Sequence, residues 1–264
     1  MKTWVIIPAR YASTRYPGKP LVPLIGATGE GRSLIRRSWD VAQATSAADR
    51  VVVATDDHRI AKHCADFGAE VAMTPETCRN GTERCAAALA PLGIADADIV
   101  INLQGDAPLT PPWFLGALAD AMTGDTQVAT PVLRLDAEGL DSFRRDRAAG
   151  RVGGTTAVFD RDGRALYFSK EVIPYTGALD PAARIPVFHH VGVYAYRPAA
   201  LRAYAGWPEA HLEGLEGLEQ LRFMENGVPV ACVEVDARGQ GFWELNNPED
   251  VPRIEAILKD LGRA

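Results

Sequence analysis

The sequence predicts an α/β protein with a doubly wound, mostly parallel central sheet of the nucleotidyltransferase, Rossmann-like kind. Strand-like and helix-like segments alternate through the first half of the chain. The strand-like runs are continuous Val/Ile stretches, as expected of parallel strands buried on both faces. After about residue 135 the pattern changes to alternating strands. We therefore expect one domain spanning 1–264, with an inserted β-rich arm at about residues 150–200.

The first half supplies the predicted sheet and its covering helices. Ser33 and Asn80 stand where helix N-caps are expected, Glu83 follows Asn80 at a capping-box spacing, and Gly68 closes a helix. A proline opens the helix after residue 110. The expected strands are 3–8, 50–55, 69–73, 98–106 and 127–133, and the expected helices are 33–44, 58–67, 80–92 and 111–122.

The second half is predicted to begin with a hairpin. Two alternating runs in 155–169 flank Asp162-Gly163, a dipeptide typical of tight turns. The segment 187–197 reads as one further strand, and 214–227 as one amphipathic helix ending at Gly227. A strand at 228–235 and a helix from Pro248 complete the expected elements.

Composition and charge narrow the functional classes. The 264 residues carry a net charge of -6, which argues against general nucleic-acid binding because such binding needs a broad basic face. The four cysteines form no CxxC pair, so reduced thiols are expected. The first strand begins at Thr3, leaving no room for a signal peptide, and no apolar run could span a bilayer. We expect a cytoplasmic protein with no membrane partner.

The stretch VIIPARYASTRYPGKP joins the first strand to a cationic loop. Arg10, Arg15 and Lys19 crowd into about ten residues, and Pro17, Gly18 and Pro20 stiffen the far end of the loop. Backbone N–H groups and cations are the two parts of a phosphate cradle. We interpret the loop as a triphosphate-binding element; the alternative is a solvated basic loop.

Further candidate groups follow the other predicted strands. In an open parallel sheet, ligands bind beyond the carboxyl ends of the strands. Asp56, the NGTER segment at 80–84 and the QGD segment at 104–106 fall at that edge, together with the cationic loop. Asp106 comes directly after an apolar strand and could hold Mg²⁺ together with substrate phosphates. By position alone, a turn or helix-start aspartate is an equally good interpretation.

These residues also carry a resemblance. The segments IIPARYASTRYPGKP, ATD, MT, NGTER, NLQGDAP, ALYFSK, HHVGVYAYR, LEGLEGLEQLR and NNPEDV are similar, in order and spacing, to the CMP-Kdo synthetases. These are the 3-deoxy-manno-octulosonate (Kdo) cytidylyltransferases. The resemblance covers essentially the whole chain. It implies transfer of CMP from CTP to a small acidic acceptor with release of pyrophosphate, a requirement for Mg²⁺, and a homodimer in which the β-rich arm forms the contact.

The resemblance assigns roles to individual positions. Arg10, Lys19 and Asp106 are the implied catalytic residues, and Asp106 and Asn246 the implied metal ligands. The implied acceptor-binding residues are Gln104, Lys170, His190, Tyr194, Glu216 and Glu219. The implied nucleotide-binding residues are Pro8, Ala9, Arg10, Ser13, Thr14, Arg15, Lys19, Met73, Thr74, Asn80, Gly81, Arg84 and Gln104.

Departures from the family pattern gather on the acceptor and metal side. Asn246 stands where the family has a second metal-binding aspartate, Ala107 replaces a glutamate, and Arg79 adds a cation near the cytosine loop. Each change moves the local charge in the direction that an additional anion requires. The favoured acceptor is therefore a phosphonate such as phosphonoformate. The alternative is Kdo or another 2-keto sugar acid.

Two other functions stay open from the sequence. GATGEGRS at 26–33 nearly matches a P-loop, with Arg32 where lysine belongs, which would suggest a kinase. The strand before it contains Pro23 and is a poor central strand. A catalytically inactive CTP-binding protein, with its metal site lost through Asn246, is the second alternative.

Overall fold

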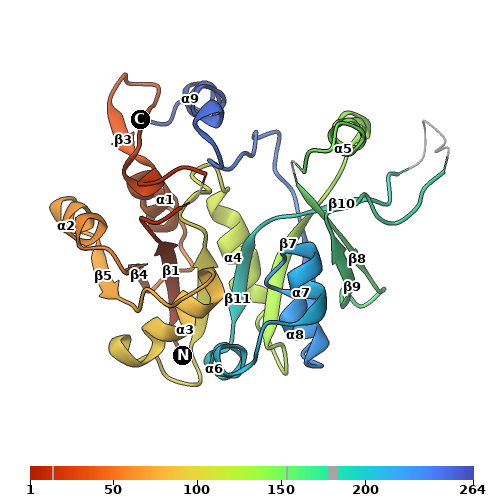
Figure 1. Cartoon of the computed structure of the whole chain (residues 1–264), viewed down its shortest axis with the longest axis horizontal. Coiled ribbons are helices and arrows are strands. Elements are labelled where there is room, and N and C mark those ends of the chain that lie inside the picture. Colours follow the sequence, from red (N-terminus) through yellow and green to blue (C-terminus); the bar gives the residue numbers. More distant parts are fainter. Residues whose placement is uncertain (14, 153, 178–183) are drawn as a thin grey trace.

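The computed structural model describes residues 1–13, 15–152, 154–177 and 184–264. Thr14, one of the predicted nucleotide-binding residues, lies outside this description. Within it, ten strands pair into one sheet in the order β5-β4-β1-β6-β11-β7-β10-β8-β9, with β12 beside β7 (Figure 1). Helices cover both faces, so the predicted α/β class and mostly parallel central sheet are confirmed.

The first half of the chain builds the parallel part of the sheet. β1 lies between β4 and β6 and runs parallel to both, so their carboxyl ends meet at one edge. The chain passes from β1 outward to β4 and β5 and returns to β6 on the other side of β1, which creates a switch in strand order at that edge. These elements are β1 (Thr3–Ala9), α1 (Leu34–Gln43), β4 (Arg50–Thr55), α2 (His58–Asp66), β5 (Glu70–Met73), α3 (Gly81–Leu92), β6 (Ile99–Leu103) and α4 (Pro112–Ala121).

The second half completes the sheet with strands of both directions. β11 inserts antiparallel between β6 and β7, and β8 and β9 form the predicted antiparallel hairpin at the far edge. These elements are β7 (Val128–Arg134), α5 (Ala137–Ala148), β8 (Thr155–Phe159), β9 (Ala165–Ser169), β10 (Phe188–His190), β11 (Val193–Tyr196), α6 (Pro198–Gly206), α7 (His211–Glu216), α8 (Leu221–Glu225), β12 (Val230–Val235) and α9 (Val251–Asp260).

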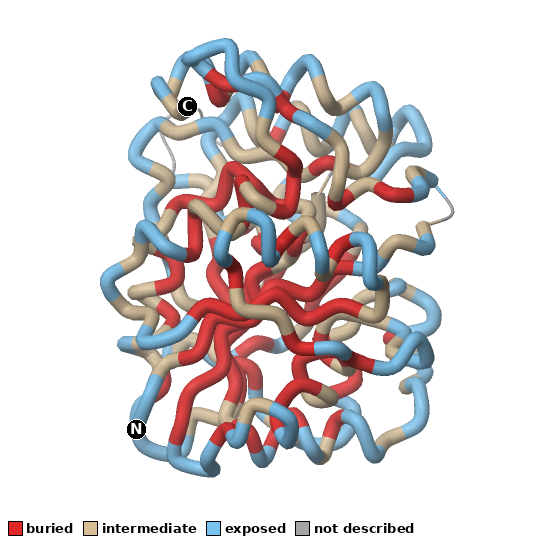
Figure 2. The backbone as a smooth tube through the Cα atoms, turned by 90° about the vertical axis from the view of Figure 1, so that its left-hand side faces the viewer, coloured by how far each residue is buried: buried red, intermediate tan, exposed pale blue. Residues whose placement is uncertain are grey.

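The core divides into two layers because successive side chains of a strand point to opposite faces of a sheet. Trp4 and Ile6 of β1 pack with residues of α3, α6 and α8, whereas Val5 and Ile7 pack with residues of α1, α2 and α4. The central strands are buried along most of their length (Figure 2). Because these strands are buried, their carboxyl ends form a fixed edge of the sheet.

Two predicted elements are each divided in the structure. The single strand expected at 187–197 is two strands, because the chain leaves β10 at Val191-Gly192 and β11 moves between β6 and β7. The single helix expected at 214–227 is α7 and α8, because Gly217 adopts a left-handed conformation with φ of 61°. In both places the apolar pattern is continuous although the backbone changes direction.

The GATGEG segment is a hairpin turn, so the P-loop interpretation was wrong. β2 (Pro23–Ile25) pairs antiparallel with β3 (Gly31–Ser33) in a small separate sheet, and the residues between them are mostly exposed. A P-loop would instead follow a central strand of the main sheet. No helix in the described ranges is long and apolar enough to cross a membrane. The cytoplasmic location stays a prediction.

Candidate active site

The cationic loop is held closed by its own backbone and by Tyr11. Gly18 has a φ of 71°, donates its N–H to the carbonyl of Tyr11 at 3.0 Å, and leads into the short 3-10 helix η1 (Lys19–Leu21). A Cβ at position 18 would meet the Tyr11 ring at 3.1 Å, so glycine is the residue that allows this close approach. The loop therefore presents Lys19 in a fixed direction.

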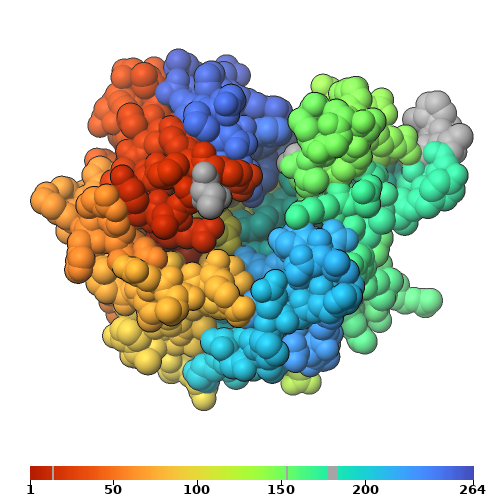
Figure 3. Space-filling view, viewed as in Figure 1, coloured from red at the N-terminus to blue at the C-terminus, as the bar shows by residue number. Residues whose placement is uncertain are grey.

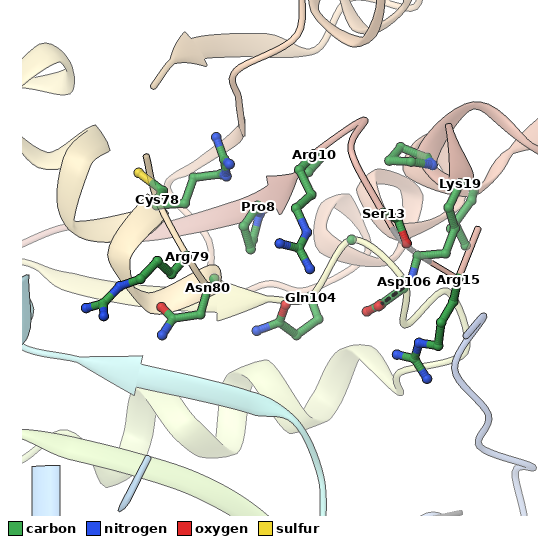
Figure 4. A pocket seen from close by; sticks show the side chains of 16 residues that line it. Pro8, Arg10, Ser13, Arg15, Lys19, Cys78, Arg79, Asn80, Gln104 and Asp106 are labelled. Atoms are coloured by element: carbon green, nitrogen blue, oxygen red, sulfur yellow. Dashed lines mark hydrogen bonds and ion pairs between the residues drawn. The ribbon is translucent and has the colours of Figure 1, made fainter. Parts of the chain in front are cut away.

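Lys19 and Asp106 form the central ion pair of the site. Lys19 Nζ lies 2.7 Å from Asp106 Oδ2, and the two side chains are 15% and 28% exposed. Figure 4 shows this pair at one end of the pocket and Arg10 extending toward the Gln104 side. The pair places one cation and one carboxylate at the carboxyl edge of β1 and β6.

One pocket gathers most of the predicted nucleotide-binding residues. It lies in the hollow that Figure 3 shows between the N-terminal half, in red and gold, and the α7–α8 region, in blue. Arg79 and Cys78 also line it, although neither belongs to the predicted set. The predicted residues that line it are Pro8, Ala9, Arg10, Ser13, Arg15, Lys19, Asn80, Gly81, Arg84, Gln104 and Asp106.

The NGTER segment forms the second wall of the pocket. Asn80 Oδ1 accepts from Glu83 N at 2.9 Å, and Asn80 Nδ2 donates to Tyr204 Oη at 2.8 Å. The predicted capping box is only half present, because the Glu83 carboxylate accepts from Arg79 N instead of Asn80 N. A Cβ at Gly81 would lie 2.7 Å from Gln104 Nε2, so a side chain here would displace the Gln104 amide from its present position.

Arg84 is a fixed cation at the back of the pocket. Its guanidinium donates to Thr74 Oγ1 at 2.6 Å and to Asp56 Oδ2 at 2.7 Å, and the side chain is 3% exposed. Thr74 therefore acts on the pocket through Arg84 and does not line it. Met73 is 43% exposed and does not line the pocket either. Asp56, noted in the sequence but given no role, is the residue that anchors Arg84.

Gln104 connects the pocket to the predicted acceptor side. Gln104 Nε2 donates to Glu219 Oε1 at 3.2 Å, and Glu219 Oε2 accepts from Thr82 N at 3.1 Å. Burial raises the pKa of Glu219 above its usual value. Glu219 thus joins the start of α3 to the connection between α7 and α8. Gln104 contacts Glu219 and also lines the pocket.

Lys170 and Glu216 lie farther out, at the end of β9. Glu216 accepts from Ser169 Oγ at 2.7 Å and from Lys170 N at 2.8 Å, so its carboxylate fastens α7 to β9. Lys170 Nζ lies 2.9 Å from the position that a Cβ would take at Gly217. These contacts give Glu216 a structural task; an acceptor-binding role for either residue stays a prediction.

His190 and Tyr194 are buried behind the pocket. His190 is 4% exposed, and its ring nitrogens lie 3.0 Å from Thr130 Oγ1 and 3.1 Å from Thr155 Oγ1. Tyr194 is 3% exposed and donates to Gln220 Oε1 at 3.0 Å. Neither side chain lines the pocket. Burial lowers the pKa of His190 to about 3 and of the neighbouring His189 to about 4.

These histidines predict acid-sensitive folding. Unfolded histidine takes up a proton near pH 6.5, whereas the two folded rings stay neutral until about pH 4 and 3. Stability is therefore unaffected above about pH 6.5 and falls below it by about 1.4 kcal/mol per pH unit for each histidine. Urea unfolding at several pH values should show this pH dependence of the unfolding free energy. His190→Gln takes up about one proton fewer on unfolding, so its slope should be smaller by about 1.4 kcal/mol per pH unit. Equal slopes in both proteins would contradict the assignment.

The predicted metal ligands fit a Mg²⁺ ion shared with substrate phosphates. Asp106 has one carboxylate oxygen on Lys19, and Asn246 Oδ1 accepts from Arg15 Nη2 at 3.1 Å. Leu245 N donates to the Asp106 carbonyl at 2.9 Å, which brings the 244–246 segment beside Asp106. All the donors are oxygens, as Mg²⁺ prefers. In the described part of the chain, no three His, Cys, Asp or Glu side chains cluster so that they could hold a metal ion.

Two polar residues near the site were missed from the sequence. Asn102 of β6 is fully buried, its amide atoms have no hydrogen-bond partner among the described residues, and its Nδ2 lies 3.2 Å from a Cβ built at Gly81. Glu244 is close enough to Asp106 for that carboxylate, after burial, to raise its pKa to about 7. A polar residue inside an apolar run, as in IVINL and FWEL, was the available signal.

Comparisons with known proteins agree with this arrangement. The sequence profile of the cytidylyltransferase family matches residues 4–234. A 3-deoxy-manno-octulosonate cytidylyltransferase of Maricaulis maris is 45% identical over 264 residues, covering 99% of each chain. The mitochondrial 3-deoxy-manno-octulosonate cytidylyltransferase of Arabidopsis thaliana is 39% identical over 97% of this chain and 82% of its own.

Solved structures give the same result. A CMP:2-keto-3-deoxy-manno-octonic acid synthetase complexed with CTP superposes with a TM-score of 0.82 at 31% identity, covering 99% of this chain and 100% of that one. A 4-diphosphocytidyl-2C-methyl-D-erythritol synthase superposes with a TM-score of 0.61 at 14% identity over 98% of this chain and 100% of that one. The second likeness shows the fold alone.

Proposed function

Because this chain belongs to the cytidylyltransferase family, in its 3-deoxy-manno-octulosonate branch, we propose that it transfers CMP from CTP to Kdo. An acceptor hydroxyl oxygen forms a bond to the α-phosphorus and gives up its proton. The bond between the α-phosphorus and the bridging oxygen breaks, and pyrophosphate leaves. The observation that carries the proposal is the full-length similarity to Kdo cytidylyltransferases, joined to a pocket lined by Arg10, Lys19 and Asp106.

Each of these three residues has a role that follows from its position. Arg10 and Lys19 would bind the triphosphate and stabilise the charge that grows on the transferring phosphoryl group. Asp106 would hold Lys19 in place through the 2.7 Å ion pair. Arg84, fixed by Thr74 and Asp56, would present a rigid wall to the cytosine base on the other side of Gly81.

We propose Mg²⁺ as the cofactor, held by Asp106 and the 244–246 segment. Bound there, Mg²⁺ would neutralise phosphate charge. The remaining tasks belong to the chain itself: the loop cations position the phosphates, and the buried strand ends keep the loops at a fixed spacing.

The structure removes much of the reason to expect a phosphonate acceptor. Ala107 is fully buried, so the missing glutamate does not change the charge of an open site. Arg79 is paired with Glu83 at 2.6 Å and lies 3.8 Å from Glu209, so its charge is already balanced. The sequence favoured phosphonoformate, but the relatives named above support the alternative, Kdo.

On the acceptor side, we propose that Gln104 contacts the sugar acid. It is the one predicted acceptor-binding residue, among those described, that lines the pocket. Glu219 holds its amide at 3.2 Å and so fixes its direction. Tyr194 and His190 would support this wall from behind.

We also propose a homodimer formed through the edge of the sheet. β9 is the terminal strand of the sheet order, and Leu166 on it is 60% exposed. Tyr175, after β9, is 95% exposed. Exposed apolar side chains at an unpaired strand edge favour pairing with a second chain. Light scattering is expected to give twice the 28.5 kDa of one chain; a monomer at micromolar concentration would contradict this proposal.

Pyrophosphate release tests the proposed function. With Mg²⁺ present, CTP and Kdo should be turned over with a kcat/KM at least roughly a hundredfold above that for CTP with phosphonoformate, since acceptors of different shape make different transition-state contacts. ATP in place of CTP should be a much poorer donor, because the chain belongs to the cytidylyltransferase family.

Other results would point elsewhere. Efficient turnover of phosphonoformate with Kdo ignored would restore the acceptor favoured by the sequence. Tight CTP binding with no pyrophosphate from any acceptor would indicate a catalytically inactive CTP-binding protein.

A further inference from the structure

The segment from Trp243 to Asn247 is clamped against the Asp106 loop. Leu245 is fully buried in a small core with Leu109 and Leu34, and its N–H donates to the Asp106 carbonyl at 2.9 Å. Asp250 accepts from the backbone N–H groups of Asn246 and Asn247 at 2.9 and 2.7 Å. The positions of the side chains on either side of Leu245 are therefore set by the fold.

Glu244 projects toward the site side of this segment. Its Oε1 lies 3.4 Å from the position of a Cβ at Gly192, which directly precedes β11 and faces the end of β6. Asp106, Lys19 and Arg15 are all close enough to act on its carboxylate electrostatically. Glu244 is thus a second carboxylate on the segment that the hydrogen bond from Leu245 N to the Asp106 carbonyl holds against the Asp106 loop.

Asn246 lies between this carboxylate and the cationic loop. Its amide is among the groups that act on the Glu244 carboxylate, and its Oδ1 accepts from Arg15 Nη2 at 3.1 Å. An amide can donate at one end and accept at the other, whereas an ionised aspartate can only accept. An aspartate here would repel Glu244, so Asn246 is chemically matched to a carboxylate at position 244.

We propose that Glu244 supplies the second charged oxygen for the divalent cation beside Asp106, and that Asn246 positions Glu244. The negative charge that the sequence lacks at position 246 is thereby present two residues earlier. Mg²⁺ in proteins commonly uses one or two carboxylates together with substrate phosphates, and Asp106 with Glu244 is such a pair. This proposal rests on the metal-dependent reaction proposed above.

Manganese binding tests the proposal without requiring turnover. Mn²⁺ is titrated into protein saturated with α,β-methylene-CTP, a non-cleavable donor, and free Mn²⁺ is followed by electron paramagnetic resonance, with the nucleotide alone as blank. Glu244→Gln should bind Mn²⁺ at least roughly tenfold more weakly than the natural chain, because one charged ligand is lost. The matched control is Glu249→Gln, an exposed carboxylate two residues after this segment, which should bind Mn²⁺ unchanged.

A charge-relocated variant separates a metal ligand from a structural carboxylate. Glu244→Gln combined with Asn246→Asp moves the charge to position 246 and should regain most of the lost affinity. Unchanged Mn²⁺ affinity in Glu244→Gln, or a loss that the double variant does not recover, would overturn the proposal. If Glu244→Gln alone does not fold, the double variant decides by the same comparison with the natural chain. No acceptor is present, so a wrong acceptor assignment would leave this result untouched.

Discussion

Asp106→Asn is expected to reduce CMP transfer by at least roughly a thousandfold, because the reaction needs fixed charges at the transferring phosphoryl group. The substitution keeps the shape of the side chain and removes its charge. Lys19 then loses its ion-pair partner at 2.7 Å, and the cation site loses its central carboxylate. The expected loss is in kcat, with CTP binding changed far less.

A matched pair elsewhere on the surface controls for the loss of an ion pair. Asp66 lies 3.0 Å from Lys62 on α2, away from the pocket, and is 60% exposed. Asp66→Asn should therefore keep full activity. Asp66→Asn should unfold within about 1 kcal/mol of the natural chain, since an exposed pair contributes little to stability. An Asp106→Asn protein that keeps most of its activity would place the reaction elsewhere.

Lys19→Ala and Arg10→Ala should each lower kcat/KM for CTP by roughly a hundredfold to ten-thousandfold. Both side chains line the pocket, and Lys19 is presented by a loop that Gly18 and Tyr11 hold closed. In either variant, the triphosphate keeps its negative charge, but one of the cations that would stabilise this charge during the transfer is missing.

The control for these variants is Lys62→Ala, which removes an exposed lysine that also pairs with an aspartate. Its steady-state rate should equal that of the natural chain. If Lys19→Ala and Arg10→Ala also retained near-normal rates, the cationic loop would be only a solvated surface.

The parallel half of the fold was predictable because its signals are local. The Val/Ile run of β1 and the Ser33 and Asn80 caps each act within a few residues, and the structure contains all three. The candidate pocket followed from the same logic, since residues placed directly after parallel strands must meet at one edge of the sheet.

The missed elements depend on distant partners. α5 buries only Leu140 among its helical residues, so its sequence has no apolar stripe from which the helix could be predicted. The breaks at Gly192 and Gly217 were not predicted, because the apolar pattern continues past both glycines. Such a pattern does not show where a strand changes its neighbouring strand or where a helix ends.

The site shows the same division. The burial of His190 and Tyr194 depends on Thr130, Thr155 and Gln220, which are far apart in the sequence. The approach of Glu244 to Asp106 likewise requires the segment before α9 to fold back over the loop after β6. Residue type alone could not reveal either contact.

The most direct test of the proposed reaction is phosphorus NMR of one mixture containing the protein, CTP, Kdo and Mg²⁺. The proposed reaction predicts that the three CTP resonances are replaced by pyrophosphate and one phosphodiester resonance of CMP joined to Kdo, in equal molar amounts. CTP that persists unchanged, or that is converted to CDP with a phosphorylated acceptor, would contradict it.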